Sequence, residues 1–457
     1  MRSLPAPDPA PIRLATEQRR VAVMAAPVVV SQVGMMLMGF VDTIMVGHVS
    51  TLDLDAVAIG NTYAFAFLIL GLGTLIGLDP LVSQAFGAGR PRDCGETYQR
   101  GLVVAGLLTL PMLAVFAIAE PMLRLFGQPP AIAERGALYV YALMPGILPF
   151  FVFVATRQFL QGLGMMRPAM VVAIAANIVN AGANWVLIWG HLGFPALGST
   201  GSGIATSFAR LFLAAAILMF IARSPALKPY PWRLTRAAFA VRPLYALLRG
   251  SFTVGVQYGI EVWAFSAVTV MMGWLGETEL AGHQITLNLL ALAFMVPVGI
   301  ANAASVSVGH AIGRHDRPGA QRAAKAALVL VLCTATVSAT LFALLPGPIA
   351  RLYTPNAHVI DMAMALIPLA ALSQFADGVQ SVGFGILRGA GDTRLPFLFN
   401  IFGYWVIGLP IAYVWTFHAR GGPQALWWGI SIGLAFVAIG IVLRVRATLA
   451  RATRIIS

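Results

Sequence analysis

Residues 322–347 read RAAKAALVLVLCTATVSATLFALLPG, and after Lys325 this stretch contains no charged side chain. A membrane-spanning helix needs about 20 consecutive, mostly apolar residues, so this stretch is long enough to cross a lipid bilayer. Eleven further stretches of the same kind occur along the chain. The twelve predicted spans lie at residues 22–47, 56–80, 99–123, 133–157, 168–190, 202–223, 248–274, 280–308, 322–347, 358–387, 395–417 and 424–444.

The composition agrees with a protein built mainly of such spans. Of the 457 residues, 59% are hydrophobic and 10% are charged, and the mean hydropathy is +0.82. Soluble domains carry about 25% charged residues, so a water-soluble globule, a disordered chain and a disulfide-rich secreted module are excluded. The two cysteines follow no metal-binding pattern. We predict an all-α integral membrane protein with twelve transmembrane helices.

The basic residues predict how the chain is oriented. Lys and Arg number 30 against 17 Asp and Glu. With the N-terminus in the cytoplasm, only Arg124, Arg135, Arg351 and Arg420 lie on the outer side, in loops or at span ends, and Arg210 lies deep within a span, so the remaining 25 bases lie on the cytoplasmic side. Positive residues concentrate in cytoplasmic loops, so we predict that both termini are cytoplasmic. No compact basic domain is left over, and we expect no nucleic-acid partner.

The two halves of the chain resemble each other at an offset of roughly 225 residues. The glycine-rich segment 161–164 recurs at 388–391, and the glycine–arginine loop at 87–90 matches 309–314. Six spans per half is an even number, so both halves have the same orientation, with a cavity expected between them. The predicted organisation is an N-terminal tail, a six-helix lobe, a proline-rich linker, a second six-helix lobe and a C-terminal tail, at 1–21, 22–223, 224–247, 248–444 and 445–457.

Of the 17 acids, thirteen lie in loops or at the ends of predicted spans, and four remain within spans: Asp42, Asp79, Glu261 and Asp377. On insertion scales, a charged side chain at the bilayer centre costs roughly 2.5–3.5 kcal/mol. We therefore expect the deep acids to face a cavity, to be paired or to be functional. Asp79 lies beside a proline near the end of the second span, where an anchor at the end of the helix is the expected role.

Glu261 lies in the middle of the seventh span, with Gln257, Tyr258 and Phe265 one helical turn away. A carboxylate beside aromatic faces can hold a desolvated organic cation by charge and by cation–π attraction. A hydrogen bond between two helices is the alternative role for this acid.

Asp377 lies in the tenth span on a polar stripe that also contains Ser373, Gln374, Gln380 and Ser381. Such a stripe does not face lipid, so it is expected to face water or the interior of the helix bundle. Polar contacts that hold neighbouring helices together are the alternative explanation.

Asp42 lies in the outer part of the first span. The fifth span offers Asn177, Asn180 and Asn184, and the sixth offers Ser202 and Thr206. Carboxylate, amide and hydroxyl oxygens are the hard ligands that small cations prefer, but spacing alone leaves open whether they converge. Arg210 lies on the same helical face as Thr206 and could pair with a carboxylate or extend toward the membrane surface.

Four segments carry a resemblance to a known family. Residues 31–34 read SQVG, residues 41–47 VDTIMVG, residues 54–61 LDAVAIGN, and residues 82–89 VSQAFGAG. Together with the paired glycine–arginine loops, they resemble the multidrug and toxic compound extrusion (MATE) family, and most closely its bacterial NorM-type branch. The resemblance extends over all twelve spans.

The resemblance implies a fold of two pseudo-symmetric six-helix lobes around a central cavity. It also implies an antiporter of the bacterial inner membrane, which exports cationic drugs and dyes in exchange for Na⁺ or H⁺. No cofactor is implied beyond the coupling ion, with Na⁺ expected and H⁺ as the alternative. The expected partners are organic cations and the lipid bilayer, and the protein is expected to be a monomer and not an enzyme.

The resemblance also assigns residues. The family's cation site in the N-terminal lobe falls on Asp42, Asn180, Asn184 and Thr206, which would hold Na⁺. The NorM-type acids of the C-terminal lobe match Glu261 and Asp377. The expected substrate cavity contains the following side chains: Gln257, Tyr258, Phe265, Gln284, Asn288, Phe294 and Gln374. Arg210 is not part of the family pattern.

Three alternative functions are weighed against this hypothesis. A lipid-precursor flippase of the wider MATE-related superfamily would need a cationic cavity for a pyrophosphate group, whereas the deep charges here are three acids and one arginine. A membrane-embedded enzyme lacks support because no HExxH, Walker A or CxxC motif occurs. A passive channel would be excluded by accumulation against a substrate gradient.

Overall fold

The computed structural model describes residues 14–451, and every regular element within that range is helical. It contains twelve helices long and apolar enough to span a membrane, in the predicted order. Several extend beyond the apolar stretches: the seventh begins at Val241 and the eighth ends at Gly313. Residues 1–13 and 452–457 of the predicted tails lie outside the described residues.

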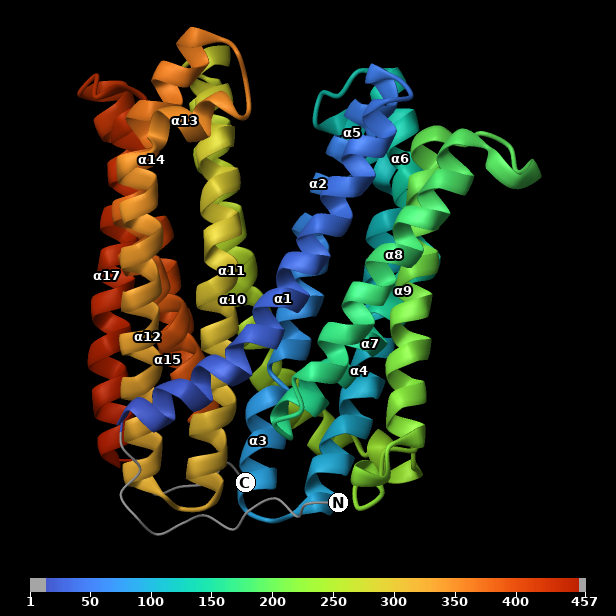
Figure 1. The fold of residues 1–457 in the computed structure, drawn as a ribbon, viewed down its shortest axis with the longest axis vertical. Helices are drawn as coiled ribbons and strands as arrows, with labels where there is room; N and C mark the ends of the chain where they lie inside the picture. Colours follow the sequence, from blue (N-terminus) through green and yellow to red (C-terminus); the bar gives the residue numbers. More distant parts are fainter. Residues whose placement is uncertain (1–13, 452–457) are drawn as a thin grey trace.

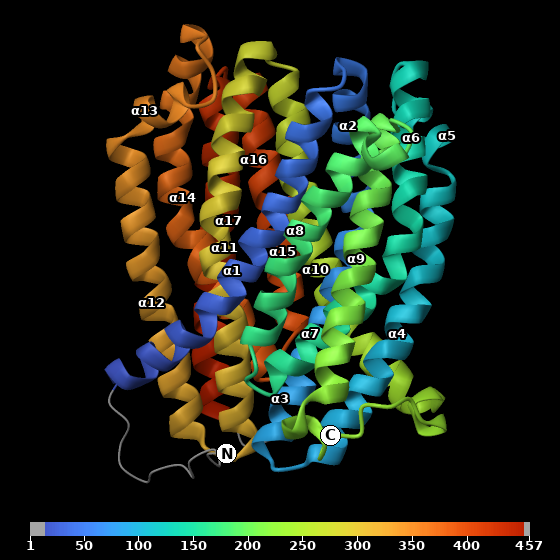
Figure 2. The same ribbon diagram turned by 45° about the vertical axis from the view of Figure 1, so that its right-hand side comes forward.

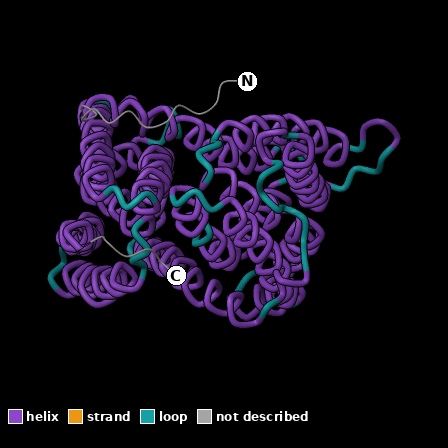
Figure 3. The backbone as a smooth tube through the Cα atoms, turned by 90° about the horizontal axis from the view of Figure 1, so that it is seen from below, coloured by secondary structure: helices purple, strands orange, loops and turns teal. Residues whose placement is uncertain are grey.

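The helices form two bundles that stand side by side (Figure 1). The elements drawn from blue to green are α1 (Leu14–Gly47), α2 (Thr51–Ile76), α3 (Asp79–Gly87), α4 (Pro91–Ala117), α5 (Ala119–Leu125), α6 (Pro130–Leu143), α7 (Ile147–Gly162), α8 (Arg167–Trp189) and α9 (Gly198–Arg223). Those from green to red are α10 (Val241–Gly273), α11 (Glu277–Gly313), α12 (Arg317–Leu344), α13 (Pro346–Arg351), α14 (Ala357–Gly389), α15 (Arg394–Asn400), the π-helix η5 (Ile401–Gly408), α16 (Leu409–Tyr413), the π-helix η6 (Val414–His418) and α17 (Gly422–Arg451). Figure 3 shows the same helices nearly end-on.

Local sequence signals set several helix ends. The Ser50 hydroxyl accepts a hydrogen bond from the Asp53 N–H and begins α2. In the same way Asp316 accepts from the Gly319 N–H at the start of α12, and Asn356 accepts from the His358 N–H at the start of α14. Each side chain satisfies a backbone donor that the first turn leaves without a partner. The loops between spans can therefore be short.

Helix α1 contributes to both bundles (Figure 2). It contains Pro27, and its early residues Val21 and Ala25 belong to an apolar cluster with Ile300 and Ala304 of α11. Its later part carries Asp42 and packs against α8. The helix is thus a physical link between the two bundles.

The bundles meet at one end of the molecule and diverge toward the other (Figure 1). We call the end where they meet the basic end, because the loops that follow α3, α7, α9, α11 and α14 lie there with most of the arginines. At this end α3 packs against α11, and a Cβ on Gly87 would collide with the His310 backbone. Hydrogen bonds also join the bundles: His310 Nε2 lies 2.7 Å from the Gly162 carbonyl oxygen, and Gln84 Nε2 donates to the Gly389 oxygen at 2.8 Å. The side chains at this end therefore leave little room between the bundles.

Candidate functional site

The first candidate site surrounds Asp42, in the bundle that α1 shares with α8 and α9. Asp42 is 3% exposed. Its Oδ1 accepts a hydrogen bond from Asn184 Nδ2 at 2.5 Å, and its Oδ2 accepts one from the Thr206 hydroxyl at 2.8 Å. Asn184 Nδ2 also donates to Asn180 Oδ1 at 3.2 Å. The structure thus brings together the four side chains predicted for the N-terminal lobe.

Helix geometry explains why these side chains converge and their neighbours do not. Asn180 and Asn184 are four residues apart, so they share a face of α8, and both are fully buried. Asn177 instead donates to the Ala173 carbonyl of its own helix and is half-buried. The Ser202 hydroxyl is buried without a hydrogen-bond partner among the described residues.

The atoms around Asp42 are suited to a small cation. Two carboxylate oxygens, a hydroxyl oxygen and the oxygen of Asn180 lie within one cluster of hydrogen bonds. Asn184 Oδ1 is buried and makes no hydrogen bond among the described residues, so rotating this amide would present another oxygen to the site. Na⁺ is a hard cation, and hard cations take oxygen ligands of these types. The described residues contain no cluster of three or more His, Cys, Asp or Glu side chains that could hold a metal ion.

Arg210 lies close to this site but forms no ion pair with Asp42 within 4.0 Å in the described chain. Its guanidinium lies 4.7 Å from the centroid of the Phe150 ring, a cation–π distance. Its Nη1 is buried with no hydrogen-bond partner in the described residues. The charge of Arg210 is still near enough to act on Asp42 and on Tyr139. Arg210 therefore lies near the Asp42 cluster without being ion-paired to it.

The second candidate site lies in the other bundle and contains two acids. Glu261 comes from α10 and Asp377 from α14, and the two are close enough to repel each other. Glu261 lies within hydrogen-bonding reach of Tyr404 and Asn400. Asp377 is 5% exposed, and its Oδ1 has no hydrogen-bond partner among the described residues. Two like charges with an unsatisfied oxygen form a site that binding of a cation or a proton would stabilise.

Tyr404 and Asn400 are site residues that the sequence analysis did not predict. Asn400 ends α15, and Tyr404 follows it in the π-helix η5. The Tyr404 hydroxyl accepts a hydrogen bond from Gln380 Nε2 at 2.8 Å, which ties it to the polar stripe of α14. π-Helical turns occur frequently at functional sites. A single Asn inside an otherwise apolar span was the signal that could have identified this region.

The residues predicted for a substrate cavity lie in several different environments. Phe265 packs near Tyr404, with ring centroids 6.2 Å apart. Gln257 and Tyr258 line a small hollow with Arg388 on the basic side of Glu261. Gln374 is buried and accepts a hydrogen bond from Ser338 of α12.

The remaining predicted cavity residues lie on α11. Gln284 and Asn288 are exposed, and Phe294 is half-buried. The spacing of four residues places Gln284 and Asn288 on one face of that helix. Helix α11 stands on the side of its bundle that faces the other bundle (Figure 1).

The buried Arg388 connects Tyr258, one of the predicted cavity residues, to the contact between the bundles. Arg388 is the penultimate residue of α14, and its guanidinium donates to Asn302 Oδ1 at 3.1 Å and to the Tyr258 hydroxyl at 3.5 Å. Asp79, the first residue of α3, is fully buried, and the charge of Arg388 acts on it. The predicted anchor at Asp79 thus lies where the first bundle meets the second. In the sequence-based prediction the tenth span ends at residue 387, which leaves Arg388 among the cytoplasmic bases.

The MatE family model matches the chain twice, over residues 27–186 and 254–414. Each match falls in one half of the sequence, as expected for an internal repeat. Together the two matches cover most of the chain.

Curated relatives and a solved structure match nearly the whole chain. Multidrug resistance protein MdtK of Edwardsiella ictaluri is 33% identical over 94% of this chain and 95% of its own length. Multidrug resistance protein NorM of Vibrio cholerae is 34% identical over 91% of this chain and 92% of its own length. The crystal structure of the eukaryotic MATE transporter AtDTX14 superposes with a TM-score of 0.89 at 19% identity, covering 96% of this chain and 99% of its own. That last similarity concerns the fold alone.

Proposed function

Because the chain belongs to the MatE family, we propose that it is a cation-coupled multidrug efflux antiporter of the NorM type. It would export organic cations in exchange for Na⁺, or for H⁺ as the alternative, by alternating access. The distribution of bases supports a bacterial inner-membrane protein with cytoplasmic termini, so the basic end would face the cytoplasm. We further propose that it acts as a monomer without a cofactor.

The observation that carries the proposal is the environment of Asp42. This carboxylate is buried in a membrane-spanning bundle, receives hydrogen bonds only from neutral side chains and has no ion pair in the described chain. Ionisable groups at such depth are costly and occur where ions or substrates pass. We propose that the coupling ion binds here, with Asn180, Asn184 and Thr206 as further ligands.

The acid pair of the second bundle supports the drug-binding part of the proposal. Glu261 and Asp377 together supply up to two negative charges, and Phe265 and Tyr404 supply aromatic faces beside them. An organic cation gains both charge attraction and cation–π contact in such a site. A proton or a metal ion would compete for the same carboxylates, and competition of this kind couples the two fluxes.

The arrangement of the bundles supports alternating access. The bundles are joined at the basic end through α3 and α11, and they diverge at the other end (Figure 1). In the proposed orientation this is an outward-facing state. For transport, an inward-facing state must also be populated, and the ion and the drug must bind the two states with different affinities.

The test is ethidium transport into everted membrane vesicles, driven separately by an imposed Na⁺ gradient and an imposed pH gradient. We expect one gradient to drive transport by the natural chain and not by Asp42→Asn. The exposed Asp55 provides a matched control, because Asp55→Asn removes an acid from the same bundle and should transport normally. Transport by Asp42→Asn at the rate of the natural chain would contradict the proposal. Transport by the natural chain that neither gradient changes would contradict it too.

A further inference from the structure

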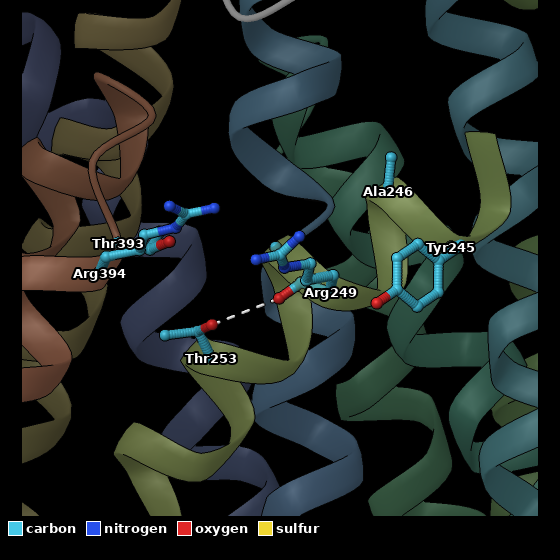
Figure 4. Close-up of a pocket in the computed structure, with 7 residues that line it drawn as sticks. Tyr245, Ala246, Arg249, Thr253, Thr393 and Arg394 are labelled. Carbon is cyan, nitrogen blue, oxygen red and sulfur yellow. Dashed lines mark hydrogen bonds between the residues drawn. The ribbon is translucent and has the colours of Figure 1, made fainter. Parts of the chain in front are cut away.

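A second kind of binding site lies at the basic end, away from both acid sites. A hollow of about 320 Å³ opens between α10 and α15, with Arg249 and Thr253 on one wall and Thr393 and Arg394 on the other. Tyr245 completes the rim (Figure 4). Two guanidinium groups therefore approach one pocket from two different helices.

These two arginines have no acidic partner among the described residues, unlike several other bases at this end. Arg92 and Arg100 both pair with Glu96. No acid lines the pocket. Asp392, which precedes Thr393 in the chain, is already bound by Arg444 at 2.6 Å and by the Thr448 hydroxyl at 3.0 Å. The pocket therefore offers positive charge and hydrogen-bond donors with no anion to satisfy them.

The donor set matches a phosphate group. A guanidinium binds two phosphate oxygens at once through its planar fork, and the hydroxyl group of Thr393 adds a single hydrogen bond, whereas the Thr253 hydroxyl donates to the Arg249 carbonyl oxygen at 3.3 Å. Because no acid is present, the pocket has nothing to pair with the ammonium of a zwitterionic headgroup. An anionic phosphodiester is the ligand that this chemistry favours.

Apolar side chains one turn deeper distinguish a lipid from a soluble phosphate. Phe252 follows Arg249 by three residues and is 48% exposed, and Leu398 follows Arg394 by four residues and is 43% exposed. These spacings place each apolar side chain on the same helical face as its arginine. Both helices run from the basic end into the membrane, so positive charge at headgroup depth is followed by apolar surface at acyl-chain depth.

We infer that the pocket between α10 and α15 binds the phosphate of an anionic phospholipid in the leaflet at the basic end. Basic pockets between transmembrane helices on the cytoplasmic side are known to bind anionic headgroups. The lipid would bridge the start of α10 and the start of α15. The site is independent of which ion drives transport.

The test is native mass spectrometry of the full chain in a non-ionic detergent, titrated with phosphatidylglycerol, with phosphatidylcholine or with inorganic phosphate. We expect phosphatidylglycerol to bind at one preferred site, with roughly tenfold weaker binding in Arg249→Ala/Arg394→Ala. Arg223→Ala/Arg236→Ala is the matched control, because it removes two exposed bases near the same end and should bind like the natural chain. Retention of ethidium transport and of the elution volume would show that each variant is folded.

Three results would overturn the inference. Equal phosphatidylglycerol binding by Arg249→Ala/Arg394→Ala and by the natural chain would show that the lipid does not bind in this pocket. Equal binding of phosphatidylcholine would remove its preference for an anion. Saturation by inorganic phosphate that fully displaces phosphatidylglycerol at equal concentration would make it a soluble-anion site, contrary to the role assigned to Phe252 and Leu398.

Discussion

The two candidate sites hold their acids in opposite ways. In the first, a single carboxylate, Asp42, has both oxygens bonded to neutral side chains from two other helices. In the second, Glu261 and Asp377 lie close together, and an oxygen of Asp377 has no hydrogen-bond partner in the described chain. The first site is pre-organised around one charge, whereas the second contains a repulsion that a bound cation relieves.

This difference suggests different ligands for the two sites. A small ion must exchange its water ligands for protein oxygens, so it gains from a set of oxygens already held in place. A large organic cation has weak hydration and gains more from a concentration of negative charge next to aromatic rings. We therefore expect the coupling ion at Asp42 and the drug at the acid pair, and the following predictions test that division.

The largest effect is expected for Asp42→Asn. The change keeps the shape of the side chain but removes the only carboxylate of the site, so the ion loses its single charged ligand. Ethidium efflux from energised cells should fall to the level of cells lacking the protein. Ethidium binding to the purified variant, measured by fluorescence polarisation, should stay close to that of the natural chain. A large loss of ethidium binding would show that Asp42 holds the drug and would break the comparison.

The second-largest effect, a loss of ethidium binding, is expected for Glu261→Gln and for Asp377→Asn. Each removes one of two charges beside the bound cation, and we expect ethidium binding to weaken roughly 30- to 100-fold, by the size of a partly screened charge interaction at close range. The double variant should bind more weakly than either single variant, because no negative charge then remains beside the cation, but the two losses should not simply add, because the two acids interact. Fluorescence polarisation measures all three.

Asp361→Asn provides the control for this pair, because Asp361 is an exposed acid on the same helix as Asp377. It should bind ethidium like the natural chain. Strictly additive losses in the double variant would indicate two independent acids, each held by its own neighbours.

The twelve spans could be predicted from the sequence because lipid imposes a simple requirement of about 20 apolar residues per helix. The ends of the helices could not be predicted with the same accuracy as the spans, because α10 begins at Val241 in a stretch that contains charged residues. Polar side chains at the membrane surface do not interrupt a helix, so hydropathy marks where the lipid ends rather than where the helix ends.

The Asp42 site was accessible to sequence analysis for a different reason. Asn180 and Asn184 share a helical face by their spacing, but only the family resemblance favoured them over Asn177. Tyr404 was missed because the chain widens into the π-helix η5, where the usual period of 3.6 residues no longer predicts which side chains share a face. The convergence of Glu261 and Asp377 depends on how α10 and α14 pack, which spacing within one helix does not contain.

A third, smaller effect is expected for Thr206→Val, which keeps the size of the side chain and removes the hydroxyl that donates to Asp42. The change removes one oxygen ligand of the proposed ion site, so the ion concentration for half-maximal efflux should rise, roughly tenfold for a lost contact of about 1.4 kcal/mol. The maximal efflux rate should change little. Thr62→Val is the control, because the Thr62 hydroxyl is exposed and bonds only within its own helix. An unchanged ion requirement would exclude Thr206 from the ion site.

The smallest effect, and the only one expected to favour ion binding, is for Arg210→Met. The guanidinium stacks on Phe150 rather than pairing with Asp42, so an apolar side chain of similar length preserves the packing and removes a positive charge near the site. The ion concentration for half-maximal efflux should fall, roughly threefold, because a nearby positive charge opposes binding of a cation. Ethidium binding at the acid pair should be unchanged. A rise in the ion concentration needed for half-maximal efflux would mean that Arg210 organises the Asp42 site instead of opposing its ligand. Arg210 would then belong to the pre-organised site, and the contrast with the repulsive pair Glu261 and Asp377 would have to include it.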